Sequence, residues 1–365
     1  MKSLTTKKKY IFNADLIRVV AILGVVGIHT LNSIYSRPDF FNGSVWWFSY
    51  LLNVIFRTSV PMFVILSGYL VLGKKTSIKD NLLRIKSRIL IPLISFYSIL
   101  HIFNFLAAYA RKEPYNYLEI LINLANSTSS HLYFLVILVF LYFLIPLFQP
   151  LFETNNKDKI KTIMMFFFAN SILSTFITYF SFRNVNIFNT FTVWILWIGY
   201  FLFGQWYKKY NLQISSKALA VTFLISYLFT AIFGYLNLYW HYNGNDIFYI
   251  VGRTYAEEYL SIGVVLMSLS LFSLLMRIQP NKLFNNKRFI SIIKKVSLLT
   301  YGIYLIHPMV MEYFNKFQGI TPDSPTMPNL WFFAFANTAI TLIVSSLLIV
   351  IIQKIPYLKK IVGII

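Results

Sequence analysis

The stretch Leu16–Thr30, LIRVVAILGVVGIHT, predicts the fold of this chain. It is apolar enough to lie inside a bilayer, yet it contains an arginine, Arg18, and a histidine, His29. Apolar runs recur to the end of the 365 residues, of which 57% are hydrophobic and 12% charged, with a mean hydropathy of +0.63. Soluble domains are typically about 45–50% apolar and about 25% charged. The composition therefore predicts an integral membrane protein.

About ten runs are long enough to cross roughly 30 Å of hydrocarbon, which takes about 20 helical residues each. They lie near residues 15–36, 45–72, 89–110, 131–152, 162–181, 190–206, 218–240, 254–276, 296–317 and 330–352. The sixth run is short, and Pro61 predicts a kink or a steep tilt in the second. We therefore expect an all-α, polytopic membrane helix bundle of about ten transmembrane helices, forming a single domain over residues 1–365.

Lys and Arg are distributed unevenly between the segments that connect these runs. The alternate segments that include the N-terminus and the C-terminal tail hold 25 basic residues, whereas the other set holds six. Because cytoplasmic loops carry the excess of Lys and Arg, both termini are predicted to be cytoplasmic, in a multi-pass protein of the bacterial cell membrane. The two remaining basic residues, Arg18 and Arg57, lie inside predicted spans.

Several classes of function are disfavoured by composition. The net charge is +21, but the basic residues sit between hydrophobic runs rather than along one solvated domain, so we expect no nucleic-acid partner. There is no Cys, which excludes disulfides, thiolate metal sites and Cys nucleophiles. We expect no metal site, and we find no cleavable signal pattern and no internal repeat. The sequence gives no indication of oligomeric state.

Arg18 and His29 lie on one face of the first predicted helix. They are eleven residues apart, which is three turns and about 16 Å. Asp15 precedes Arg18 by three residues and can pair with it. A titratable group at mid-membrane is costly and usually lines a cavity or a pathway. The structural alternatives are an Arg18 that reaches the headgroups and a His29 that only bonds between helices.

Arg57 lies about 18 Å into the second span, at a similar predicted depth. A guanidinium there needs a partner or an anionic ligand, since neither surface is within reach. Pro61, four residues later, frees a backbone carbonyl, which is compatible with irregular backbone lining a cavity. The structural alternative is pairing of Arg57 with a buried carbonyl group.

Arg84 and Arg88 are spaced i, i+4 at the cytoplasmic start of the third span. Ordinary positive-inside charge would explain them. Alternatively, they bind phosphates of a cytosolic ligand, since the guanidinium fork matches phosphate geometry. Arg253 and Glu257 form another i, i+4 pair, near the outer end of the eighth span, either in a ligand cleft or as an exposed ion pair.

The segment NADLIRVVAILGVVGIHT resembles the first helix of the membrane-bound acyltransferase family 3, which is marked by Arg, ten residues and then His. The resemblance continues in RTSVPMFVILSGYLVL, in HLYFLVILVFLYFLIPLF from His131, in WILWIGYFLFGQW and in YGIYLIHPMV from Tyr301. It covers essentially the whole chain in the family's order. The single-domain O-acetyltransferases are the members that this chain most resembles.

The resemblance implies an O-acyltransferase that moves acetyl from acetyl-CoA to an extracytoplasmic glycan or lipid-linked sugar acceptor. Carried over by motif, His29 is the essential residue, Arg18 is its partner, and Arg88 is the basic residue that opens the third helix. The family often places its second arginine closer to Arg88 than Arg84 is. His131 and His307 match recurring positions, and the alternative reading of His307 is a hydrogen bond at the helix break made by Pro308.

Two catalytic schemes follow. In one, neutral His29 takes the proton of a sugar hydroxyl that attacks the thioester, and in the other His29 itself carries the acyl group. In both, Arg57 offsets oxyanion charge, while Arg18, Arg84 and Arg88 hold phosphates of the acyl-CoA. The alternative function is a transporter or exporter, or a sensor module without transferase activity. No inverted repeat is found, and the acids cluster at span ends rather than forming a mid-membrane relay.

We predict that a reporter fused after Ile365 faces the cytoplasm, because the tail belongs to the segments rich in Lys and Arg. Fusions to a fluorescent protein should fluoresce, and fusions to a phosphatase that is active only outside the cytoplasm should be inactive. The converse pair of results would contradict the predicted topology and every depth derived from it.

Overall fold

The computed structural model describes residues 10–112, 116, 131–154, 156–180, 191–246, 249–250, 253–280, 287–317 and 330–363. The helices are α1 (Phe12–Tyr35), α2 (Ser44–Phe56), α3 (Ser59–Val71), α4 (Ile78–Ile85), α5 (Ile91–Arg111), α7 (Tyr133–Phe143), α8 (Ile145–Glu153), α9 (Lys157–Phe180), α10 (Ile198–Tyr210), α11 (Ser216–Tyr242), α12 (Ile262–Met276), α14 (Lys287–Phe317), α15 (Leu330–Lys354) and α16 (Leu358–Ile361). Short turns are η1 (Pro38–Phe40), η2 (Lys86–Leu90), η3 (Val193–Trp197) and η4 (Tyr255–Glu257), and strand β1 (Tyr249–Ile250) pairs antiparallel with β2 (Arg253–Thr254).

The predicted all-α, polytopic bundle is confirmed. Within the described ranges, eight helices are long and apolar enough to cross a membrane, and α7 with α8, bent by 52°, passes the same test as a pair. The short sixth run forms η3 and α10. Residues of α10 are mostly buried, between α3 and α9. The predicted count of ten spans and the cytoplasmic placement of both termini stay predictions.

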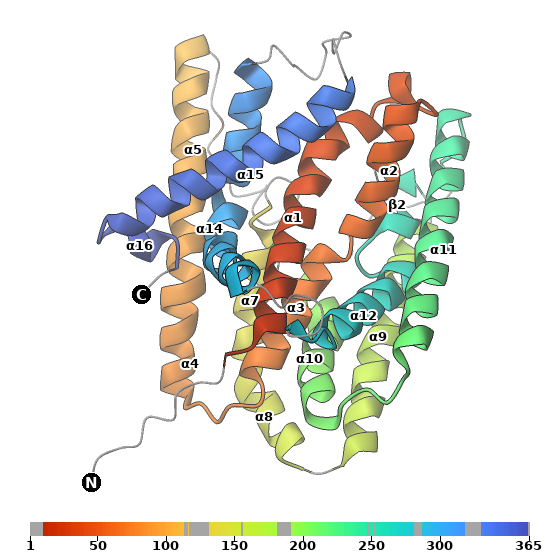
Figure 1. Ribbon diagram of the computed structural model, residues 1–365, viewed down its shortest axis with the longest axis vertical. Helices are drawn as coiled ribbons and strands as arrows, with labels where there is room; N and C mark the ends of the chain where they lie inside the picture. The colour runs from red at the N-terminus through yellow and green to blue at the C-terminus, as the bar shows by residue number, and fades with distance from the viewer. Residues whose placement is uncertain are drawn as a thin grey trace.

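Helix α1 is the centre of the bundle (Figure 1). It contacts α2, α3, α12, α14 and α15, and 72% of its most apolar window is buried. An added Cβ at Gly24 would lie 2.0 Å from Oγ of Ser59, so only glycine lets the second span approach this closely. Helices α3 and α10 meet in the same way, because a Cβ at Gly68 would lie 1.8 Å from the carbonyl oxygen of Phe201.

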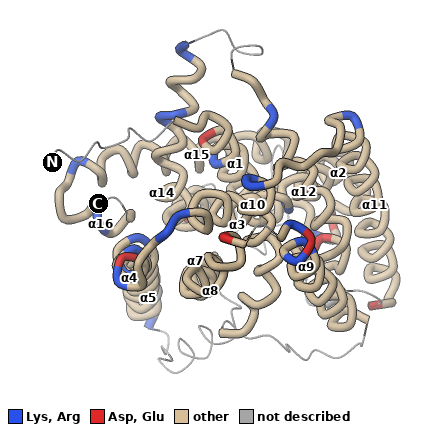
Figure 2. Tube along the Cα trace, turned by 90° about the horizontal axis from the view of Figure 1, so that it is seen from below, with Lys and Arg blue, Asp and Glu red and all other residues tan. Residues whose placement is uncertain are grey.

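Basic side chains gather at helix ends. Figure 2, which looks at the bundle from below, shows Lys and Arg on α4, α9 and near α16. Lys208 at the end of α10 donates 2.9 Å to the carbonyl of Tyr69, and Lys209 donates 2.5 Å to that of Phe152. Some of the basic residues that fix the predicted topology therefore also bind carbonyls at helix ends.

The second span is interrupted at Arg57 and Thr58, between α2 and α3, as the presence of Pro61 in this span predicted. The reason is that proline lacks an N–H and crowds the carbonyl four residues earlier, which here belongs to Arg57. The two helices nevertheless form one span of 28 residues. The interruption therefore carries a charged side chain, that of Arg57.

A second proline shapes the start of the third span. Pro92 cannot donate to the carbonyl of Arg88, and the preceding turn, η2, is a π-helical turn. The hydroxyl of Tyr301, on α14, donates to that carbonyl at 2.9 Å. A side chain from another helix thus supplies the bond that the backbone cannot make.

The bend between α7 and α8 follows the same rule. Pro146 cannot donate to the carbonyl of Tyr142, and Nδ2 of Asn81 donates to it instead at 2.7 Å. Asn81 is 2% exposed, so this bond is made inside the protein and ties α4 to α7.

We predict that Tyr301→Phe lowers the free energy of unfolding by about 0.5–1.5 kcal/mol, because the carbonyl of Arg88 loses its donor. In a Pro92→Ala background, Tyr301→Phe should lower the free energy of unfolding by clearly less, because the N–H of the alanine can donate a hydrogen bond to the carbonyl of Arg88. Thermal unfolding of the four purified proteins in detergent measures the coupling.

Tyr313→Phe, on the same helix but with a side chain 56% exposed, is the matched control and should leave stability unchanged. Equal losses from Tyr301→Phe in both backgrounds would show that the hydroxyl does not replace the missing backbone donor.

Candidate active site

Three histidines that are far apart in the sequence form one cluster. The ring of His307, on α14, lies 5.2 Å from that of His29, on α1, and 5.3 Å from that of His131, just before α7. Nε2 of His131 lies 3.2 Å from the carbonyl oxygen of Leu305, so it donates to α14. We call His29, His131 and His307 the histidine cluster. The sequence singled out each of them but did not place them together.

His29 is partly exposed although it lies in the central helix. It makes no side-chain hydrogen bond with any described residue. Its neighbour Thr30, in contrast, is fully buried and bonds to Thr338 of α15 at 2.6 Å. A histidine with accessible surface and no bonding partner fits a site-lining residue better than an interhelical bond.

His307 makes the hydrogen bond expected at a helix break. Its Nδ1 lies 2.8 Å from the carbonyl oxygen of Tyr304 and 3.2 Å from that of Ile303. Pro308 leaves the carbonyl of Tyr304 without its usual backbone donor. The side chain is 0% exposed, and its Nε2 has no hydrogen-bond partner among the described residues.

Arg57 has side-chain partners rather than the carbonyl that was its structural alternative. Nε donates to Oδ1 of Asn53 and Nη2 to the hydroxyl of Tyr35, both at 3.0 Å. The guanidinium also lies 5.8 Å from the centre of the Tyr259 ring. Asn53, which accepts from Arg57, also donates through Nδ2 to the carbonyl of Ile28 at 3.4 Å, so Arg57 lies beside the turn of α1 that carries His29.

Glu257, in η4, is a buried carboxylate whose charge bears on this part of the site. Its charge acts on both Arg57 and Tyr35. The alternative of an exposed ion pair is wrong for this residue, because it is 2% exposed. Oε2 accepts from Thr254 at 3.1 Å, whereas Oε1 has no hydrogen-bond partner in the part of the chain that is described. The side chain of Arg253, its predicted partner, lies outside the described residues.

Arg18 forms the pair with Asp15 that the sequence predicted. Nη1 donates to Oδ1 of Asp15 at 2.6 Å, and Ser297 of α14 donates to the same oxygen at 2.7 Å. Arg18 also reaches Oγ of Ser297 at 3.4 Å. The side chain is 33% exposed, so it binds α1 to α14 and still presents surface.

The other two predicted arginines lie on α4 and η2, which pack against α7, the helix that carries Tyr142. The charges of Arg18, Arg84 and Arg88 all act on Tyr142, and we call these three residues the arginine cluster. Arg88 is exposed and Arg84 is half-buried. Nη1 of Arg84 is buried without a hydrogen-bond partner among the described residues. A buried guanidinium N–H of this kind suits an oxygen of an anionic ligand.

Tyrosines connect the two clusters. Tyr301 and Tyr304 interact through space along α14, and Tyr301 interacts likewise with Tyr142. The ring of Tyr304 lies 5.5 Å from that of His131, and its hydroxyl donates to the backbone carbonyl of His131. The polar line therefore runs from the arginine cluster, through three phenols, to the histidine cluster and Arg57. These three tyrosines and Tyr35 were not predicted as site residues, because no motif or spacing in the sequence marks them.

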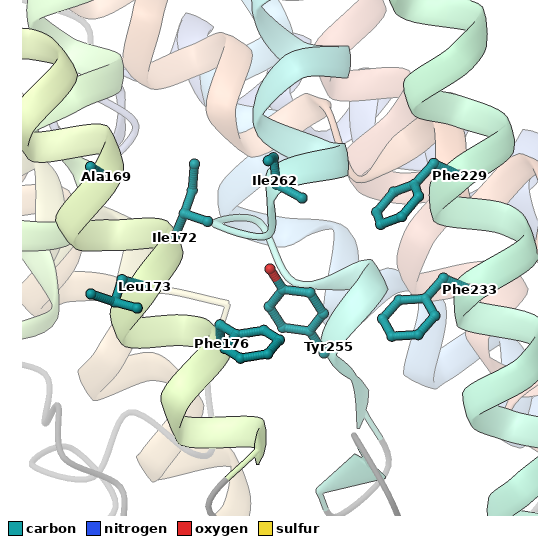
Figure 3. A pocket seen from close by; sticks show the side chains of 8 residues that line it. All are labelled: Ala169, Ile172, Leu173, Phe176, Phe229, Phe233, Tyr255 and Ile262. Carbon is teal, nitrogen blue, oxygen red and sulfur yellow. The ribbon is translucent and has the colours of Figure 1, made fainter.

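The cavity in Figure 3 is of a different kind. It holds about 420 Å³ and is apolar, with one phenol as its polar group. Its walls come from α9, α11, η4 and the start of α12, and they are Ala169, Ile172, Leu173, Phe176, Phe229, Phe233, Tyr255 and Ile262. No group of His, Asp or Glu in the described residues has the arrangement of a metal site. Proton-transfer and anion-binding groups are found along the polar line.

Comparison with known proteins gives one match. Residues 11–350 match the family model described as an acyltransferase domain. No curated protein and no solved structure gives a significant match. The matched range includes every residue of both clusters, as well as Arg57 and Glu257.

Proposed function

Since this chain belongs to the membrane-bound acyltransferase family 3, we propose that it transfers acetyl from cytosolic acetyl-CoA to a hydroxyl of an extracytoplasmic or lipid-linked glycan. The observation that carries this proposal is the polar line that joins the arginine cluster to His29. A bacterial cell membrane is the proposed location. The family match disfavours a transporter or a sensor without transferase activity.

The arginine cluster is the proposed site for the phosphates of acetyl-CoA. The charges of all three arginines act on Tyr142, and Arg84 keeps a buried N–H without a hydrogen-bond partner in the described structure. Arginine forks bind phosphate with two parallel hydrogen bonds, which favours a nucleotide over a simple carboxylate. Arg18, which shares a helix face with His29, would lie closest to the thioester end.

Neutral His29 is the proposed base. It removes the proton from the acceptor hydroxyl while that oxygen bonds to the thioester carbonyl carbon. Arg57, fixed by Asn53 and Tyr35, offsets the negative charge that develops on the carbonyl oxygen. The carbon–sulfur bond then breaks, and the thiolate takes the proton from His29. In the rival scheme, His29 attacks first and passes the acyl group to the hydroxyl.

Glu257 is the proposed contact for the acceptor. Its free Oε1 is buried near Arg57, where it can accept a hydrogen bond from a second hydroxyl of a sugar. A sugar held there would approach the site from the side of η4, opposite to the arginine cluster. This arrangement supports donor and acceptor entering from different ends of the polar line.

We expect His29→Ala to insert, to purify and to bind acetyl-CoA, but to lose at least about 10²-fold in acetyl transfer, the lower end for a positioned base. Arg18→Ala should instead weaken donor binding. The measurement is transfer of labelled acetyl from acetyl-CoA to glycans in membrane vesicles, together with donor binding by the purified protein.

His101→Ala is the matched control, because His101 lies on α5 and packs on Tyr97 of the same helix. It should transfer acetyl normally. If His29→Ala stays within about tenfold of the parent, His29 is neither base nor acyl carrier, and both schemes are wrong.

We also expect Arg84→Gln with Arg88→Gln to weaken acetyl-CoA binding at least tenfold, since two phosphate contacts are removed. Binding of a short acetyl thioester without the nucleotide should change little. Calorimetric titration of the purified double variant with each donor makes this comparison.

Lys79→Gln with Lys86→Gln removes the same charge from exposed positions of the same segment and serves as the control. Equal weakening by both double variants would assign the effect to general surface charge and would contradict a phosphate site at Arg84 and Arg88.

A further inference from the structure

The protonation pattern of the His307 ring is fixed by its neighbours. A carbonyl oxygen only accepts hydrogen bonds, so Nδ1, which contacts the carbonyls of Tyr304 and Ile303, must carry the proton. The neutral ring then has its lone pair on Nε2. Pro308 is the origin of this arrangement, since it leaves the carbonyl of Tyr304 in need of a donor.

The lone pair of Nε2 is buried without a donor. His307 is 0% exposed, and Nε2 has no hydrogen-bond partner among the described residues. A buried acceptor left unpaired is unfavourable, and such atoms are uncommon in native proteins. An N–H or O–H group should therefore meet Nε2 in the working state of the site.

His29 is the neighbour placed to supply that group. Two imidazoles joined by an N–H···N bond of roughly 2.9 Å have ring centres about 5 Å apart, and the two centres here are 5.2 Å apart. His29 has no hydrogen bond to any described side chain, so its ring is not committed elsewhere. The ring centres already have the required separation, and a rotation of the His29 ring that turns one of its nitrogens toward Nε2 of His307 would complete the bond. His131 is committed to Leu305 through Nε2.

We propose that His307 is a positioning residue for His29, resting on the acyl transfer proposed above. Nε2 of His307 accepts the N–H of one nitrogen of His29. The other nitrogen of His29 then carries the lone pair and faces the acceptor hydroxyl, which is the tautomer a base needs. When that nitrogen takes the hydroxyl proton, the bond to His307 stabilises the imidazolium until the thiolate removes the proton.

Two substitutions separate this role from a purely structural one. His307→Asn keeps a donor near the position of Nδ1, so it can still serve the carbonyl of Tyr304, but it has nothing at the position of Nε2. His307→Gln places an amide near Nε2 and loses the donor at Nδ1. If the role of His307 is only structural, His307→Asn should have the higher acetyl-transfer activity of the two variants. If His307 positions His29, His307→Gln should have the higher activity.

The assay uses membrane vesicles with labelled acetyl-CoA as the probe and counts alkali-labile acetyl on retained glycans. We expect His307→Asn to lower kcat at least about tenfold, with an unchanged KM for acetyl-CoA and an unchanged melting temperature. His307→Gln should melt earlier and yet retain more activity per folded protein than His307→Asn. The reverse order of activities, or a His307→Asn enzyme as active as the parent, would overturn the proposal.

A second measurement does not depend on activity. Nitrogen NMR of histidine-labelled protein in detergent should show His307 as the Nδ1–H tautomer, with a His29 signal that moves in His307→Asn. An Nε2–H tautomer of His307 would overturn the inference even in an active enzyme. An inactive parent that shows the expected tautomer and shift would instead count against the proposed acyl transfer, while the pairing of the two rings would stand.

Discussion

A backbone carbonyl inside a membrane has no water to bond with, and this constraint organises much of the bundle. Each proline in a span releases the carbonyl four residues before it. Asn81, Tyr301 and His307 donate to three of these released carbonyls, and each of these bonds uses a side chain of the site or of its immediate surroundings. Some of the polar side chains near the site are therefore explained by the hydrogen bonds they donate to backbone carbonyls, independently of any role in catalysis.

Helix α14 collects most of these contacts on one face. Ser297, Tyr301, Tyr304 and His307 follow one another at intervals of three or four residues, which places them on one stripe of an α-helix. Ser297 meets Asp15 near the start of α1, and His307 meets His29 14 residues further along α1 and ten residues further along α14. This stripe of α14 therefore runs beside α1 and connects the arginine cluster to the histidine cluster.

Hydropathy and charge were enough to predict the spans, and local spacing was enough to predict the pair of Asp15 and Arg18, because both depend on neighbours in the sequence. The histidine cluster and the approach of Glu257 to Arg57 depend on contacts between distant helices, which no spacing encodes. The break at Arg57 was also predictable, because the effect of a proline falls on the carbonyl four residues before it.

The π-helical turn η2 begins two residues after Arg84 and contains Arg88. Such a turn closes a ring one residue longer than an α-helical turn, so it can absorb one extra residue without disturbing the helices on either side. Consider two family members in which the arginines corresponding to Arg84 and Arg88 are separated by numbers of residues that differ by one. A π-helical turn in one of them lets both proteins present the two guanidinium groups in the same directions. Correct alignment of such chains would need a gap placed inside a helix, and a search with a fixed interval between the two arginines would overlook true members.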